Sequence, residues 1–220
     1  MKEKINKLLP TFAWLPLTLV VGFNMIIYYL IPPILGDVYR YDLSIWIDYQ
    51  LPLLTWFISF YILAYVQWIG SYWYHCSRDK KLCYEITSAD LIGKLLSALC
   101  FIFIPTAIVR PEIQIDGFFD YWTDFIYFTD KPINLFPSIH CLESWICFRG
   151  AMMLPKKNYF YIVFQFVFTL FVFGSTVFVK QHFIVDIPVA VLFGEIGIFI
   201  SRKCNGWKMV NALQPKSLRV

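Results

Sequence analysis

Long apolar blocks constrain this chain more than any other feature of its sequence. Each block runs for about 17 to 25 residues, the length that lets an α-helix cross a hydrocarbon core about 30 Å thick at about 1.5 Å per residue. Hydrophobic residues make up 59% of the 220 positions and charged residues only 15%, whereas an average soluble domain is about 25% charged. A water-soluble fold could not bury that much apolar surface, so the sequence predicts an all-α bundle in a membrane.

The apolar blocks predict about six transmembrane helices. We place them roughly at residues 11–34, 51–72, 91–109, 138–154, 159–179 and 182–200. The chain is long enough for one bundle and too short for an additional soluble domain, so residues 1–220 are expected to form a single domain. The first block is longer than a signal-peptide core and no small-residue cleavage pattern follows it, so we interpret it as a retained helix.

Charged residues between the blocks predict the orientation of the bundle, because lysine and arginine that flank a span tend to stay in the cytoplasm. The basic segments, which we place inside, are residues 2–7, 78–81, 156–157 and 202–219. The acidic connections, which we place outside, are residues 37–48 and 110–136. Both termini are then cytosolic, in a multi-pass protein of the cell membrane. Orientation explains the net charge of +4, so the expected partner is the bilayer and not a nucleic acid.

Two cysteines fall in the connection that we place in the cytosol. They are Cys76 and Cys83, and thiols in that compartment normally stay reduced. We therefore expect no structural disulfide between them.

Two of the three histidines, His140 and His182, fall at outer ends of predicted helices, so the topology brings them to the same side of the membrane. Asp186 follows His182 four residues later on the same expected helical face, where its carboxylate can accept the proton of one ring nitrogen and fix the tautomer. The other nitrogen is then free to act as a nucleophile or base. A purely structural His–Asp pair and metal ligation are the alternatives.

His140 lies in the first turn of the fourth predicted span, for which Ser138 is a natural N-cap after Pro137. A phosphate at that helix start would meet free backbone N–H groups and the positive end of the helix dipole. Ser138 could add a hydroxyl donor, and His140 could protonate a leaving oxygen. Simple capping would also account for the serine.

Arg110 sits where the third predicted span leaves the membrane on the same outer side. Its guanidinium suits phosphate oxygens, with interfacial snorkelling as the alternative role. Deeper in the bundle, Glu143 lies one turn inside His140 and is expected to orient His140 or Arg110. Glu195 and Lys94 belong to the inner half and are expected to pair.

Taken in order, these residues form a recognisable pattern. An Arg-Pro starts at Arg110, a Pro-Ser-x-His ends at His140, and Ser175 is followed by a His-x-x-x-Asp that runs from His182 to Asp186. This order, on consecutive outer ends of a six-helix protein, resembles the type 2 phosphatidic acid phosphatase superfamily. The motifs cover residues 110–186, and the topology covers the whole chain.

The resemblance implies a role for each matched residue. His182 would attack the phosphorus to form a phosphohistidine, Asp186 would orient His182, and His140 would protonate the leaving group. Arg110 and Ser138 would help to hold the phosphate. The family requires no metal, and we expect no cofactor.

Two positions depart from the family pattern. The lysine that precedes the arginine of the first motif is replaced by Phe103, and the arginine that follows the serine of the third motif is replaced by Thr176. Lys180 is close to His182 in sequence and could replace one missing cation, or it could only mark the membrane interface. The expected substrate-binding residues are Arg110, Ser138, Ser175 and Lys180.

The resulting expectation is a membrane lipid phosphatase that hydrolyses a lipid phosphomonoester or diphosphate at the outer membrane face. An enzyme that transfers a phospho-headgroup to an alcohol is the alternative, because the same departures make the chain similar to the branch that includes inositol phosphorylceramide synthase. A transporter or scaffold without turnover is a second alternative.

Overall fold

The computed structural model describes residues 9–220, and this part of the chain forms helices without a β-strand. Its long helices are α2 (Trp14–Leu35), α4 (Ile58–Arg78), α5 (Lys80–Phe103), α7 (Ile139–Met153), α8 (Tyr159–Phe178) and α9 (Asp186–Lys203). Its shorter helices are α3 (Trp46–Gln50), α6 (Phe118–Thr129) and α10 (Trp207–Leu213), with 3-10 turns η1 (Thr11–Ala13), η2 (Thr55–Phe57) and η3 (Lys216–Leu218). Lys2, Lys4 and Lys7, which helped to predict a cytosolic amino terminus, lie outside the described residues.

Three segments are long and apolar enough to cross a membrane. They are Thr11–Leu35, Lys80–Phe103 and Tyr159–Phe178. The all-α prediction is therefore confirmed, and these three segments support membrane association.

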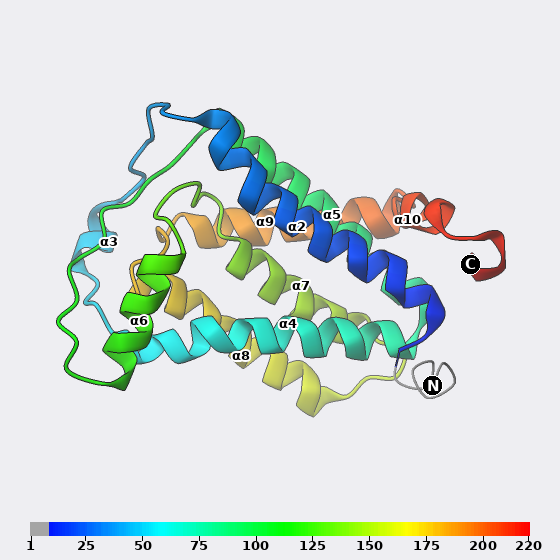
Figure 1. Cartoon of the computed structure of the whole chain (residues 1–220). Coiled ribbons are helices and arrows are strands. Elements are labelled where there is room, and N and C mark those ends of the chain that lie inside the picture. Colours follow the sequence, from blue (N-terminus) through cyan, green and yellow to red (C-terminus); the bar gives the residue numbers. More distant parts are fainter. Residues whose placement is uncertain (1–8) are drawn as a thin grey trace.

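The central helix of the bundle is α7, which packs against α4, α5, α8 and α9. α2 packs along α5, and α5 also packs along α9. In Figure 1 the long helices cross one another obliquely, with α3 and α6 at one end of the bundle and α10 with the carboxyl terminus at the other. Residues carried by α7 therefore contact most of the bundle.

The helix boundaries differ from the predicted spans most clearly around Asp79. Its carboxylate accepts a hydrogen bond from the backbone N–H of Leu82 at 2.6 Å and so caps the start of α5. The same residue ends α4. α5 consequently begins at Lys80 instead of near residue 91, and only one residue separates the two helices.

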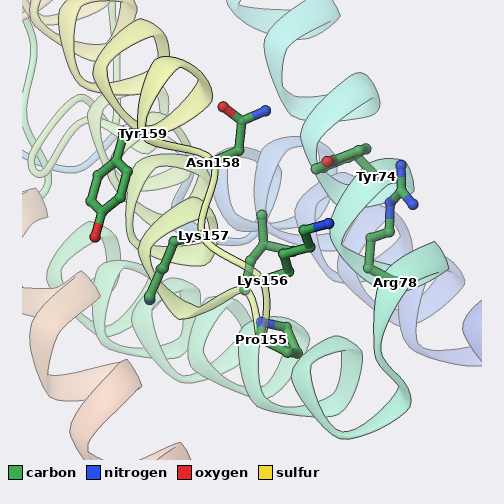
Figure 2. A pocket seen from close by; sticks show the side chains of 8 residues that line it. Tyr74, Arg78, Pro155, Lys156, Lys157, Asn158 and Tyr159 are labelled. Carbon is green, nitrogen blue, oxygen red and sulfur yellow. The ribbon is translucent and has the colours of Figure 1, made fainter.

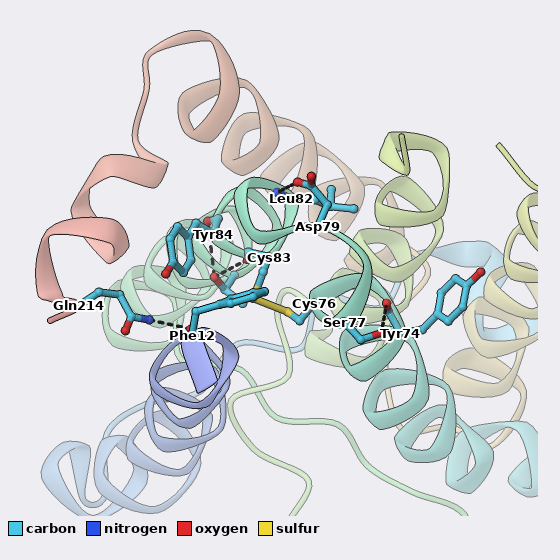
Figure 3. Close-up of a disulfide and its surroundings, with 10 residues drawn as sticks. Phe12, Tyr74, Cys76, Ser77, Asp79, Leu82, Cys83, Tyr84 and Gln214 are labelled. Atoms are coloured by element: carbon cyan, nitrogen blue, oxygen red, sulfur yellow. Dashed lines mark hydrogen bonds between the residues drawn. A yellow bond between two sulfur atoms is a disulfide. The ribbon is translucent and has the colours of Figure 1, made fainter. Parts of the chain in front are cut away.

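The expectation for the two cysteines was wrong, because Cys76 and Cys83 form a disulfide (Figure 3). Cys76 lies in the last turn of α4 and Cys83 in the first turn of α5. The abrupt reversal at Asp79 brings these two turns together, with the Cα atoms 4.3 Å apart. The cellular compartment alone does not predict this geometry.

Two predictions for buried charges were also wrong. Lys94 does not contact Glu195, because its ammonium lies 2.9 Å from Asp90 Oδ2 and contacts Glu143 Oε1. Glu195 instead accepts a hydrogen bond from Trp145 and pairs with Arg149, both at 2.8 Å. Glu143 thus faces α5 and orients neither His140 nor Arg110.

Candidate active site

The side chain of His182 is fixed by two acceptors. Its Nδ1 lies 2.8 Å from Asp186 Oδ2 and 3.1 Å from the carbonyl oxygen of Leu135. Because both partners can only accept when Asp186 is ionised, the proton resides on Nδ1 and the Nε2 lone pair remains free. The predicted His–Asp pairing is therefore confirmed.

The position of His182 in the secondary structure differs from the prediction. His182 lies in the turn before α9, and Asp186 is the first residue of that helix. The carbonyl oxygen of Thr176 accepts hydrogen bonds from the backbone N–H groups of Gln181 and His182, both at 3.0 Å. Asp186 Oδ2 also accepts from the backbone N–H of Phe183 at 3.2 Å. These bonds, and not a shared helical face, hold the pair together.

The ammonium of Lys180 does not contact the His182–Asp186 pair. Its backbone adopts a left-handed φ of 53°, and its ammonium donates hydrogen bonds to the carbonyl oxygens of Asp48 and Leu51 at 2.8 and 2.7 Å. Burial of the amine lowers the pKa of Lys180. The side chain therefore ties the turn to the α3 segment and does not replace a missing phosphate ligand at His182.

His140 lies in the first turn of α7, as predicted, and is enclosed by aromatic rings. Its imidazole stacks on Tyr61 with centroids 3.9 Å apart, and Trp68 and Tyr65 lie at 4.9 and 5.4 Å. The rings of His140 and His182 are 6.3 Å apart. The Nε2 atom of His140 is buried and has no hydrogen-bond partner among the described residues.

Arg110 is linked to the turn of His182 through the residue before this histidine. Its Nη2 donates to Gln181 Oε1, and its Nη1 donates to the carbonyl oxygens of Asp130 and Tyr127 at 2.6 and 3.3 Å. Burial lowers the pKa of Arg110, while the nearby Asp130 carboxylate opposes that shift. Since Arg110 lies beyond the end of α5, the extended segment that follows the helix delivers the guanidinium to the site.

The two serines have different surroundings. Ser138 is the N-cap of α7, is fully buried and accepts from the backbone N–H of Cys141 at 3.4 Å, and its hydroxyl also lies against the Cys141 thiol. Ser175 donates its O–H to the carbonyl oxygen of Val172 at 2.7 Å and is fully buried. Both serines are therefore engaged by their own helices, Ser138 as the cap of α7 and Ser175 within α8.

Two polar residues of the site were missed by the sequence reasoning. Gln181 is buried, and its Nε2 has no partner among the described residues while its Oε1 holds Arg110. Asp130 accepts hydrogen bonds from the hydroxyls of Tyr28 and Tyr61 at 3.0 and 3.2 Å, which links α2 and α4 beside His140. Adjacency to His182 was the only sequence signal for Gln181.

The unsatisfied atoms around the histidines indicate what the site can bind. His140 Nε2, Gln181 Nε2 and Arg110 Nε are buried without partners among the described residues, and burying such groups without hydrogen bonds is costly. Gln181 Nε2 and Arg110 Nε are obligate donors. An anion that carries several acceptor oxygens would provide partners for both.

A pocket at another place in the fold is lined by none of these residues. Its volume is about 550 Å³, and it is lined by Tyr74 and Arg78 of α4 and by the turn from Leu154 to Tyr159 (Figure 2). None of the histidines lines it. Because pocket size without chemistry does not identify an active site, we place the candidate site at the histidines.

Within residues 9–220, no group of three or more His, Cys, Asp or Glu side chains is placed to hold a metal ion.

The chain matches no protein-family model, no curated protein and no solved structure. Functional assignment therefore depends on the geometry of the site.

Proposed function

We propose that this chain is a membrane-embedded lipid phosphatase of the type 2 phosphatidic acid phosphatase kind. One observation carries the proposal: the Asp-held imidazole of His182 lies 6.3 Å from that of His140, and Arg110 is bonded to the residue beside His182. A nucleophile, an acid and a cation close to one another are what phosphoryl transfer requires.

In the first half-reaction, His182 Nε2 attacks the phosphorus and forms a P–N bond while the P–O bond to the lipid alcohol breaks. His140 donates its proton to the departing oxygen. Asp186 keeps the Nδ1 proton in place and stabilises the positive charge that develops on the ring of His182. Arg110 and Gln181 are positioned to hold non-bridging phosphate oxygens.

In the second half-reaction, a water molecule attacks the phosphohistidine. His140 accepts a proton from that water, the P–N bond breaks, and inorganic phosphate leaves. His182 and His140 return to their starting states, so the cycle needs no redox partner.

The proposed setting is a bundle of six spans with both termini in the cytosol and the site at the extracytoplasmic face. α4, α7 and α9 would be the further spans, beside the three long apolar segments. The alternation of acidic and basic connections supports this arrangement. A lipid could then present its headgroup to the histidines while its tails remain among hydrocarbon chains.

Phosphotransfer to an alcohol is the second candidate, and the sparse positive charge of the site favours it. Thr176 donates its hydroxyl to the carbonyl oxygen of Phe173 at 2.8 Å, Phe103 is 75% exposed on α5, and Lys180 points toward α3. One guanidinium suits the single negative charge of a phosphodiester better than a dianionic phosphomonoester. In this variant an alcohol replaces water as the attacking group.

The test measures product release by purified protein from a panel of lipid phosphates, diphosphates and phosphodiesters, with and without a labelled acceptor alcohol. We expect phosphate release or headgroup transfer that disappears in His182→Ala and persists in chelator. His75→Gln is the matched control, since His75 is buried and bonded to Tyr161 away from the site. Equal turnover by His182→Ala would refute the mechanism, and no turnover of any lipid would favour a transporter or scaffold.

A further inference from the structure

A second group of ionisable side chains is buried between α5 and α7. Asp90 and Lys94 belong to α5, and their side chains are 0% exposed. Glu143 extends from α7 with a side chain 6% exposed. The ammonium of Lys94 binds both carboxylates and also donates to the carbonyl oxygen of Val20 at 3.4 Å.

This centre, consisting of Asp90, Lys94 and Glu143, contains two acidic side chains but only one basic side chain. Two ionised carboxylates and one ammonium would leave one uncompensated negative charge among apolar helices. The other ionisable side chains that face it are Tyr72 of α4 and Cys147 of α7, and both are neutral at ordinary pH. An unpaired charge at such depth is strongly unfavourable.

The hydrogen bonds of the centre are also incomplete. Asp90 Oδ1, Glu143 Oε2 and the hydroxyl of Tyr72 are buried without a partner among the described residues. Tyr72 is only 6% exposed, and its hydroxyl lies beside the carboxyl group of Glu143. The Tyr72 hydroxyl can donate to one of these carboxyl groups. One carboxylate oxygen without a donor and one uncompensated negative charge remain, and a single bound proton supplies what both lack.

We infer that this centre is a proton-binding site in which Asp90 and Glu143 share one proton, so that the Asp90–Lys94–Glu143 group is neutral in the folded bundle. The proton turns one unpartnered carboxylate oxygen into a donor. It lets a single ammonium compensate the remaining carboxylate. The site is independent of the histidine chemistry, although Glu143 lies three residues after His140 on α7.

Protein in detergent with the histidines intact allows a direct test by infrared spectroscopy. At neutral pH the wild-type chain should show the carbonyl band of a buried protonated carboxylic acid. Glu143→Gln should lack this band, since the amide replaces the protonated acid while Asp90 stays ionised beside Lys94. Glu195→Gln should retain it, because Glu195 is paired with Arg149.

A stability measurement provides a second readout. The folded chain holds one proton more than the unfolded chain, whose free carboxyls are ionised above about pH 5, so stability should fall as the pH rises. The unfolding equilibrium constant of the wild-type protein should gain about tenfold per pH unit relative to that of Glu143→Gln. Glu195→Gln should keep the wild-type slope.

Two results would overturn the inference. A wild-type protein without the band, and with the same pH slope as Glu143→Gln, would mean that both carboxylates are ionised. An absent band combined with stabilisation by sodium, but not by a bulky organic cation, would assign the positive charge to a metal ion. Should Glu143→Gln fail to fold, Asp90→Asn removes the same excess charge and should likewise abolish the band.

Discussion

The orientation of a single imidazole determines whether His182 can react. Asp186 and the carbonyl oxygen of Leu135 both accept from Nδ1, which leaves the Nε2 lone pair free for the proposed attack on phosphorus. The spacing of four residues was sufficient to predict this pairing, because two side chains so close in sequence meet both in a helix and in the turn that the chain actually forms.

Asp186→Asn tests the tautomer. The amide can donate to Nδ1 and would then stabilise the ring with its lone pair on the wrong nitrogen. We expect a loss of about 10⁴-fold in kcat, as for the equivalent change in a catalytic triad, with the fold preserved as judged by circular dichroism. Near wild-type turnover would show that Asp186 is only structural.

Gln181→Leu tests whether Gln181 holds phosphate, as proposed. The change removes a donor that faces the site and the acceptor that holds Arg110. Loss of a hydrogen bond to a charged group corresponds to about 1.5–3 kcal/mol, so kcat/KM should fall about 10- to 100-fold. Unaltered kinetics in this variant would remove Gln181 from the site.

Lys180→Met tests whether Lys180 is a phosphate ligand or only ties the turn to the α3 segment. Because the ammonium bonds the carbonyl oxygens of Asp48 and Leu51, the change should reduce stability by about 1–3 kcal/mol and leave kcat/KM within a small factor of the wild-type value. Thermal unfolding and lipid turnover are measured on the same preparation. A large loss of kcat/KM without destabilisation would restore the lysine as a phosphate ligand.

Among the elements, those with strong apolar periodicity and clear caps were predictable. The predicted fourth and fifth spans, residues 138–154 and 159–179, match α7 and α8 to within one or two residues at each end. Ser138 marked the start of α7 and thereby the place of His140. The start of α5 was missed because charged residues near Lys80 were interpreted as a loop, whereas Asp79 caps a helix directly.

Sequence could not place side chains that meet across distant elements. Asp130 binds the hydroxyls of Tyr28 and Tyr61, and no spacing rule links those three positions. Lys94 pairs with Asp90 and Glu143, and not with Glu195, because α5 packs against α7 at Lys94. Such pairings depend on tertiary packing, which periodicity does not encode.

The cap that Asp79 forms at the start of α5 can be tested by substitution. Asp79→Ala removes the side-chain acceptor for the N–H of Leu82 and should reduce stability by about 1 kcal/mol. Asp79→Asn is the matched control, since asparagine also caps helices, and should lose less. Denaturant titration in mixed micelles compares the three proteins, and equal losses would argue against capping.

For the whole molecule, the orientation in the membrane determines whether two cysteines are oxidised or reduced. The positive-inside pattern places Cys76 and Cys83 in the cytosol, yet the folded chain pairs them. If the proposed orientation holds, the cytosol should keep this pair reduced in intact cells. Because both cysteines are fully buried, their thiols should be labelled by a thiol reagent only after the cells are opened and the protein is denatured. A bond found intact in freshly quenched and denatured cells would indicate the opposite orientation.

The aromatic enclosure of His140 has a practical consequence. The indole of Trp68 is held by a hydrogen bond to Ser144 at 3.0 Å and lies 4.9 Å from the imidazole. A cationic imidazole at that range quenches indole fluorescence, while the neutral ring does so far less. The difference in emission between the wild-type chain and Trp68→Phe therefore supplies a built-in optical readout of protonation at His140, obtained without any substrate or external dye.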